Sequence, residues 1–230
     1  MTISRQRGLG LLLLLATGFL PACNMSVNGP ITLQDGEKRD GNLSTVNGRI
    51  SIGSRCTLDG SCRTVNGRIT VGRGAHTGDL QSVNGPIEID ADAVVSDSVE
   101  TVNGSIRIGA GSKVERDVAS INGSIVLRGT KVGRDVRTIN GGVHLDEGTV
   151  VQGDVIIEDK SVSLGRGRHV LEITLSGGSV VQGDIINESD DVDVEIRLEG
   201  ESKILGRVTG AKVIEGGAAQ RGDDPATSSR

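Results

Sequence analysis

Apolar and polar residues alternate in short runs that recur along the chain, each beginning just after an Asn-Gly pair. Counted from the Asn, the third and fifth residues are Ile, Leu or Val in every copy, and the residue between them is polar in most copies. One copy reads Ile106, Arg107, Ile108 after Asn103. A period of two is typical of a β-strand with one buried face. The pattern therefore predicts a short strand in each copy.

The Asn-Gly pairs return at intervals of 18 or 19 residues. A fixed period of this size indicates a solenoid, in which every repeat stacks on its neighbours. We therefore predict an all-β fold, a single-stranded parallel β-helix (β-solenoid) with about 18–19 residues per coil and strands stacked at about 4.8 Å. The pairs that define the repeat begin at Asn28, Asn47, Asn66, Asn84, Asn103, Asn122 and Asn140.

We expect each Asn-Gly pair to form the turn before its strand, because this dipeptide is favoured where the backbone adopts positive φ. Aligned Asn side chains can also hydrogen-bond from coil to coil through their amide groups. A row of Asn residues that binds a ligand is the alternative interpretation. The turn explains every one of these residues, so we favour the structural role.

A second signature, Gly-x-x-Val followed by Asp and an aliphatic residue, occupies the other half of the coil. It occurs at 111–118 and 129–136 and continues at 148–155 and 178–185, where the Asn-Gly pair has stopped. The chain therefore divides into regular repeats over 26–146 and longer irregular coils over 147–215, which together form one solenoid domain, 23–215. Residues 216–230 are rich in Gly, Ala, Asp and Ser and are expected to form a disordered tail. The alternating acidic run 190–197 is expected to blunt the far end and keep the rod monomeric.

Residues 1–22 have the form of a secretory signal, with Arg5 and Arg7 before an apolar stretch from Leu9 to Phe19. Leu20-Pro21-Ala22-Cys23 resembles the bacterial lipobox. That resemblance implies that Cys23 becomes the lipidated (palmitate-bearing) N-terminus and anchors the protein in a membrane. Asn24 in place of Asp at the next position implies the outer membrane, on its periplasmic face or at the cell surface.

Composition limits the core and the chemistry. Phe19 is the only aromatic residue, so the core must consist of Ile, Val and Leu. In an oxidising compartment Cys56 and Cys62 are expected to form a structural disulfide. The three histidines lack the spacing of a metal site, and we expect no metal, cofactor or nucleic acid as a ligand. These histidines are His76, His144 and His169.

Charge is distributed unevenly along the chain. Residues 38–73 carry a net charge of +5, and residues 184–201 carry −7. We expect the basic coils near the lipid to rest on anionic headgroups. The arginines expected to make this contact are Arg49, Arg55, Arg63, Arg68 and Arg73.

Asp117 and Asp135 recur at equivalent positions beside Arg116 and Arg134. Solvent-facing ion pairs are the favoured interpretation, and a carboxylate row that cleaves a polysaccharide is the alternative. The repeated Thr/Ser-Val-Asn-Gly-x-Ile-x-Ile unit over 26–146 resembles the adhesin family of bacterial exported β-solenoid proteins. The resemblance implies a right-handed β-helix and a cell-envelope role, with no catalytic residues to carry over. The second signature is similar to the polymer-forming bactofilins.

These expectations favour a non-enzymatic envelope lipoprotein, a monomeric rod whose repetitive surface serves adhesion or scaffolding. Its partners would be the membrane, through the lipid, and envelope glycans or other envelope proteins. A polysaccharide-active enzyme on the same fold requires a cluster of carboxylates in a groove. A bactofilin-like polymer requires uncapped ends. Each alternative therefore makes a distinct structural demand.

Overall fold

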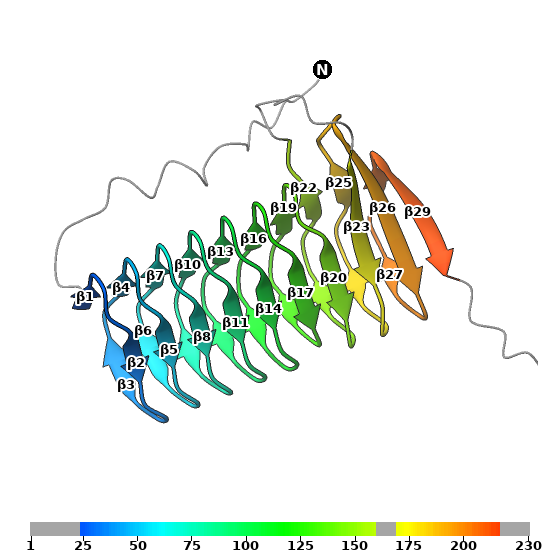
Figure 1. Cartoon of the computed structure of the whole chain (residues 1–230). Helices are drawn as coiled ribbons and strands as arrows, with labels where there is room; N and C mark the ends of the chain where they lie inside the picture. Colours follow the sequence, from blue (N-terminus) through cyan, green and yellow to red (C-terminus); the bar gives the residue numbers. More distant parts are fainter. Residues whose placement is uncertain (1–23, 160–168, 217–230) are drawn as a thin grey trace, which may run out of the picture.

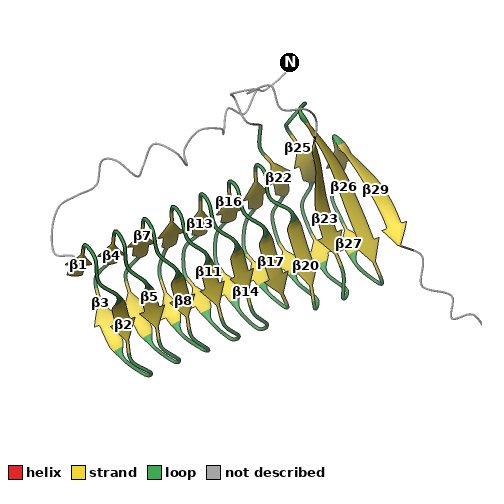
Figure 2. Ribbon diagram, in the orientation of Figure 1, coloured by secondary structure: helices red, strands yellow, loops and turns green. Residues whose placement is uncertain are grey.

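The computed structural model describes residues 24–159 and 169–216 as a rod built of strands and turns (Figures 1 and 2). The chain passes through three sheets in turn and then steps up by one coil, so every strand pairs with its equivalents in the neighbouring coils. The strands of every pair are parallel, for example Ile87–Ile89 with Ile106–Ile108. The predicted parallel β-solenoid is confirmed. Within the described ranges no helix is long and apolar enough to cross a membrane.

Three sheets, which we name A, B and C, form the sides of the rod. Sheet A contains β1 (Asn24–Ser26), β4 (Leu43–Thr45), β7 (Cys62–Thr64), β10 (Leu80–Ser82), β13 (Val99–Thr101), β16 (Val118–Ser120), β19 (Val136–Thr138), β22 (Val155–Ile157), β25 (Ile185–Asn187) and β28 (Val208–Thr209). Sheet B contains β2 (Ile31–Leu33), β5 (Ile50–Ile52), β8 (Ile69–Val71), β11 (Ile87–Ile89), β14 (Ile106–Ile108), β17 (Ile125–Arg128), β20 (Val143–Asp146), β23 (His169–Leu175), β26 (Val192–Glu199) and β29 (Ala211–Gly216). Sheet C contains β3 (Lys38–Asp40), β6 (Thr57–Asp59), β9 (His76–Thr77), β12 (Val94–Val95), β15 (Lys113–Val114), β18 (Lys131–Val132), β21 (Val150–Val151), β24 (Val180–Val181) and β27 (Lys203–Ile204).

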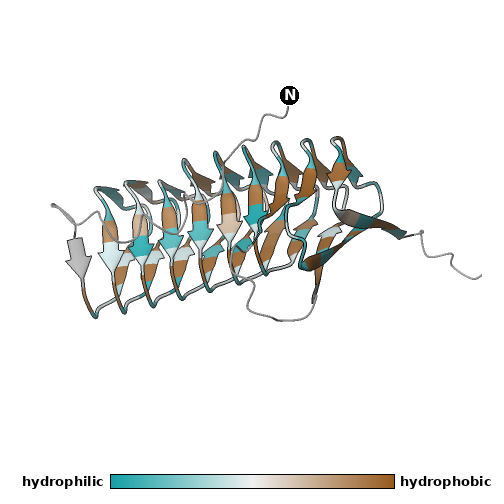
Figure 3. Ribbon diagram, turned by 90° about the horizontal axis from the view of Figure 1, so that it is seen from above, coloured by the Kyte–Doolittle hydropathy of each residue, from teal (hydrophilic) through white to brown (hydrophobic). Residues whose placement is uncertain are grey.

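The core is a set of aliphatic columns that run along the rod axis (Figure 3). In sheet B the first and third residues of each short strand point inward, and Ile69, Ile87 and Ile106 are fully buried. A single coil is too thin to bury these side chains alone, so each one packs against the coils above and below. The alternation predicted from the sequence is therefore the inward and outward alternation of sheet B.

A second inward column consists of hydroxyl residues, whose role the sequence pattern did not reveal. They are the buried residues Thr45, Thr64, Ser82, Thr101, Ser120 and Thr138, each two positions before an Asn. In the interior of the rod five of these hydroxyls donate to a glycine carbonyl of the coil below, as Thr101 Oγ1 does to Gly85 O at 3.1 Å. The sixth, Thr138 Oγ1, donates to Gly141 O of its own coil at 2.8 Å. These bonds satisfy polar groups that would otherwise be buried without a partner.

The asparagines form the expected ladder. Asn103 Nδ2 donates to Asn84 Oδ1 at 2.9 Å, and Asn122 Nδ2 donates to Asn103 Oδ1 at 2.7 Å. The bond is repeated between all seven residues, from Asn28 to Asn140. The ladder therefore runs continuously along the edge between sheets A and B.

The glycine of the Asn-Gly pair serves a different purpose from the one expected. Its φ is not positive in these turns, whereas positive φ occurs in the turns between sheets B and C, for example at Gly36, Arg55 and Asp92. A Cβ on Gly104 would instead collide with the carbonyl oxygen of Gly85 in the coil below. Glycine is required here because successive backbones approach too closely for any side chain.

The last coils keep the stacking but are longer, as predicted. Strands β23 and β26 have seven and eight residues, against three or four in the sheet B strands of the regular coils. The run 190–197 enters β26, and β29 pairs with β26 on its far side. The prediction that this run blunts the far end is therefore wrong, because the chain adds one more coil beyond it. The signal 1–22, Cys23 and the tail from 217 onward lie outside the described residues.

The two remaining cysteines are buried and are free thiols. Cys56 immediately precedes β6 of sheet C, and its Sγ donates to Gln34 O at 2.8 Å. Cys62 begins β7 of sheet A, where burial raises the pKa of its thiol to about 12. The predicted disulfide is not formed, since the two side chains enter the core from different sheets.

Candidate functional site

The outer face of sheet A carries a cluster of acidic side chains and arginines, and we call it the sheet A face. Three columns of outward residues cross it, one before, one within and one after each strand. The first column contains Asn42, Ser61, Asp79, Ser98, Asp117, Asp135, Asp154 and Asp184. The second contains Ser44, Arg63, Gln81, Glu100, Ala119, Arg137, Ile156 and Ile186. The third contains Val27, Val46, Val65, Val83, Val102, Ile121 and Ile139, followed by Glu158 and Glu188.

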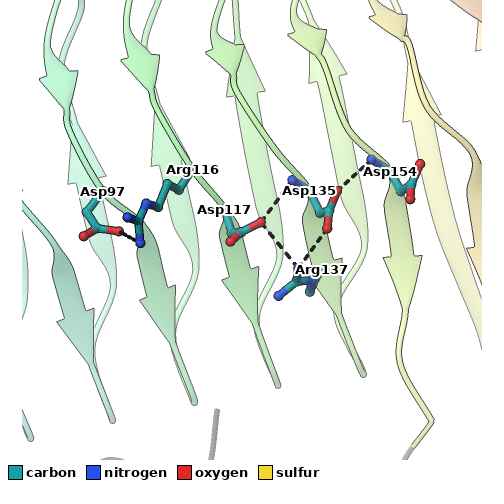
Figure 4. Close-up of polar contacts among 6 residues, drawn as sticks. All are labelled: Asp97, Arg116, Asp117, Asp135, Arg137 and Asp154. Atoms are coloured by element: carbon teal, nitrogen blue, oxygen red, sulfur yellow. Dashed lines mark hydrogen bonds and ion pairs between the residues drawn. The ribbon is translucent and has the colours of Figure 1, made fainter. Parts of the chain in front are cut away.

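The aspartates of the first column hold successive coils together (Figure 4). Asp117 Oδ1 accepts the backbone N–H of Asp135 at 3.1 Å, and Asp135 Oδ1 accepts that of Asp154 at 3.0 Å. Asp154 Oδ1 accepts the N–H of Asp184 in the same way at 2.7 Å. Their recurrence in the sequence thus has a structural cause, because each carboxylate satisfies an amide at a corner of the rod.

Ion pairs form on this face, but with other partners than expected. Arg116 Nη1 lies 3.2 Å from Asp97 Oδ1, in the coil below. Arg137 Nη2 lies 2.8 Å from Asp135 Oδ2 and 3.5 Å from Asp117 Oδ1, so it spans two coils (Figure 4). The sequence predicts ion pairs among Asp117, Asp135, Arg116 and Arg134. The structure instead pairs Arg116 with an aspartate of the coil below, and it pairs Arg137 with one aspartate of its own coil and one of the coil below.

Two acids at the centre of the face hold protons unusually tightly. Burial, followed by repulsion from Asp97, raises the pKa of Asp79 to about 6, and Arg63 at 3.9 Å opposes the shift. Burial, followed by repulsion from Asp79 and Asp117, raises the pKa of Glu100 to about 7. Glu100 Oε2 also accepts a hydrogen bond from Gln81 Nε2 at 3.4 Å. At neutral pH, Glu100 is therefore divided between its acidic and its ionised form.

Glu100 and Arg137 lie on either side of Ala119 in the second column. Ala119 is only 4% exposed although it points outward, so larger neighbours close over it. The positive charge of Arg137 lowers the pKa of Glu100, against the effect of the surrounding acids. A carboxylic acid, a guanidinium group and two carboxylates thus lie together on a flat face. The sequence singled out Asp117 and Asp135 by their repetition but missed Asp79, Glu100 and Arg137, because none of these three has an identical residue in the same column of an adjacent coil.

The arginines expected to contact a membrane are spread around the rod. Arg63 lies on the sheet A face, and Arg49 and Arg68 follow the turns from sheet A to sheet B. Arg55 and Arg73 lie in the turns from sheet B to sheet C. Two of them already have acidic neighbours, Arg63 with Asp79 at 3.9 Å and Arg68 with Glu88 at 3.2 Å. The structure therefore does not gather these five side chains on one face.

Over the described ranges, no three His, Cys, Asp or Glu side chains are grouped so that they could hold a metal ion. His76 is exposed on β9, and His144 points outward from β20. The side chains of the sheet A face can form hydrogen bonds and ion pairs with a partner, and Glu100 can exchange a proton. In comparisons with protein-family models, curated proteins and solved structures, none matches this chain.

Proposed function

We propose that this chain is a lipid-anchored lipoprotein of the bacterial outer membrane, a rod whose lateral faces serve adhesion or scaffolding. The observation that carries the proposal is the way the recurring polar residues hydrogen-bond neighbouring coils to one another. The Asn, Asp and hydroxyl columns are hydrogen-bonded from coil to coil, and the rod is stiffened along its whole length. Ten described strands in each of sheets A and B correspond to a length of about 43 Å. Such a rod presents extended faces whose geometry repeats at every coil.

The anchor is supported by the position of the first strand. Because β1 begins at Asn24, a lipid on Cys23 would join the rod without a linker. The experiment is metabolic labelling with palmitate, followed by fractionation of the envelope. The full chain should be labelled and sediment with the outer membrane, and Cys23→Ala should be unlabelled and released. An unlabelled wild-type chain would remove the anchor from the proposal.

The sheet A face is the part of the rod that we assign to contact with envelope partners. Its carboxylates and guanidinium groups suit hydroxyl-rich glycans or the polar surface of another envelope protein. Binding of the purified rod to isolated cell envelopes should fall several-fold in Glu100→Gln and Arg137→Gln. The matched control is Thr70→Ala, which changes an outward residue of sheet B. Equal binding by all variants would place the contact on a different face.

A second candidate function rests on Glu100 itself. A carboxylic acid with a pKa of about 7, beside Asp117 and Arg137, has the properties of a general acid. A polysaccharide-cleaving activity would release reducing ends from anionic or neutral glycans, and its rate would fall above pH 7. Glu100→Gln should abolish that activity while leaving the envelope binding of the rod partly intact. Absence of product from a panel of envelope polysaccharides would exclude this candidate.

A further inference from the structure

The described part of the rod ends in open sheet edges on both sides. Strands β1, β2 and β3 each have a partner only in the next coil, and β28, β29 and β27 each have a partner only in the preceding coil. An unpaired edge strand is a template for another chain. Because every coil repeats the same register, a second copy stacked end to end could continue sheets A and B, while sheet C, with nine described strands against ten, would lack one strand at the junction. The residues at the two ends decide whether this occurs.

At the N-terminal end, charged residues occupy inward positions of sheet C. Arg39 of β3 is in register with Leu58 of β6, which is 3% exposed. The later residues of this column are Thr77, Val95, Val114, Val132, Val151, Val181 and Ile204, so Arg39 is its one charged member. Glu37 similarly occupies the position of Cys56 in the next coil, and its carboxylate accepts the N–H of Gln34 at 2.9 Å.

At the C-terminal end, the same exchange occurs in sheet B. Glu215 of β29 is in register with Leu198 of β26. The preceding members of this column are Leu33, Ile52, Val71, Ile89, Ile108, Leu127, Leu145, Leu175 and Leu198. Nine coils therefore carry an aliphatic residue, and the tenth carries a carboxylate. Val213, two residues earlier, keeps the adjacent column apolar and is 40% exposed.

We propose that Arg39 and Glu215 prevent the ends of the rod from pairing with further copies of this chain. Stacking the last coil of one copy on the first coil of the next would place Glu215 beside Leu33 in sheet B. In sheet C, Arg39 would enter the aliphatic column that ends at Ile204, one strand position away from it. Glu215 would lose water inside an aliphatic core, and Arg39 could not pair with it, because the two charges belong to columns of different sheets. Removing a charge from water without a well-placed partner is strongly unfavourable. Every junction contains one first coil and one last coil, so every junction contains both residues.

Sedimentation velocity and electron microscopy test this proposal on the chain from Asn24 onward, which contains every strand that the structure describes. The wild type should be monomeric. Arg39→Leu with Glu215→Leu should associate end to end into filaments one rod wide, with an association constant raised about 100-fold or more. Each single variant should associate less strongly than the double variant. The control, Lys38→Leu with Lys212→Leu, adds the same side chains at outward positions of the same two strands and should remain monomeric.

Three outcomes would overturn the proposal. The first is filament formation by the wild type, and the second is equal association by the control. The third is a double variant that keeps the circular dichroism of the wild type and remains monomeric at all concentrations. If the double variant does not fold, Glu215→Leu alone decides, because Glu215 is exposed and its replacement leaves the core unchanged. The proposal concerns the ends of the rod and is independent of the lipid anchor and the sheet A face.

Discussion

The regular coils over 26–146 and the longer coils over 147–216 are held together by the same core but by different side-chain ladders. In the first region the Asn ladder follows the edge between sheets A and B, and it ends at Asn140. In the second region the aspartate ladder follows the opposite edge of sheet A and continues from Asp154 through Asp184 to the N–H of Arg207 at 2.7 Å. The two ladders overlap between Asp117 and Asn140. One polar ladder can therefore replace another, provided that the aliphatic columns continue.

The closely packed glycines lie next to a different ladder in each region. In the regular coils, glycines that cannot carry a Cβ follow the asparagines, as Gly104 does. In the later coils, they precede the aspartates, where a Cβ on Gly183 would collide with the carbonyl oxygen of Gly153. Each region thus places its tightest backbone contact next to its side-chain ladder. The comparison suggests that a ladder and a glycine corner form one structural unit.

Truncation of the core should have the largest effect and should be equal in the two regions. Ile106→Ala and Ile196→Ala each remove a fully buried side chain, and each should lower the free energy of unfolding by about 2–5 kcal/mol. Urea denaturation followed by circular dichroism measures the change. A much smaller loss for Ile196→Ala would show that the irregular coils do not share the core of the regular ones.

Substitution of a corner glycine should cause the second largest loss in the free energy of unfolding. Gly104→Ala and Gly183→Ala should each cost about 2–3 kcal/mol, because the carbonyl below must move. Gly36→Ala is the control, since its Cβ would meet no atom within 4 Å and only its φ of 73° is unfavourable. That variant should lose about 1 kcal/mol. Equal losses at all three positions would contradict the close-approach explanation.

The next largest effect should be the pH dependence of stability, which arises from Glu100 in the regular coils. The raised pKa of Glu100, about 7, lies above its ordinary value of 4.5, so the folded chain binds this proton more tightly than the unfolded chain does. Its stabilising effect is complete below about pH 4.5 and is lost as the pH rises through 7. Glu100→Gln should reduce this pH-dependent loss by about 2 kcal/mol in denaturation experiments between pH 4 and 8.

The control for this prediction is Thr70→Ala, which changes an outward residue of sheet B that has no titratable group and should leave the pH profile unchanged. Asp79, with a pKa of about 6, should produce a smaller effect of the same sign. A profile that is insensitive to Glu100→Gln would indicate that the acids of the sheet A face titrate normally. The titration would then have to be sought among the acids of the later coils.

Removal of one ladder side chain should have the smallest effect. Asn103→Ala interrupts two amide bonds on the exposed edge, and Asp154→Ala leaves the N–H of Asp184 without its acceptor. Each should cost about 1 kcal/mol in thermal or urea denaturation. Because both ladders serve the same purpose, we expect similar values. A cost confined to Asp154→Ala would mean that the Asn ladder contributes little beyond the turn itself.

Much of the fold could be predicted because a β-solenoid is encoded locally. The spacing of Asn28 to Asn140 determines the coil length, and the alternation after each Asn determines which side chains of sheet B point inward. Both patterns depend only on neighbouring residues and on the repetition of one unit. The signature around Gly111 and Gly148 similarly identified the coils that continue beyond Asn140. These features needed no knowledge of the path around the corners.

Only the tertiary structure decided which coils and sheets meet at each charged or buried group. Arg137 bonds to Asp117 across coils, and the acidity of Glu100 depends on Asp79 in another coil, contacts for which no sequence spacing is diagnostic. The paths of the corners likewise keep Cys56 and Cys62 apart. The stacking register also places Arg39 and Glu215 in aliphatic columns. Repetition determines the shape of a coil, whereas single residues acquire their roles from the neighbours that stacking brings to them.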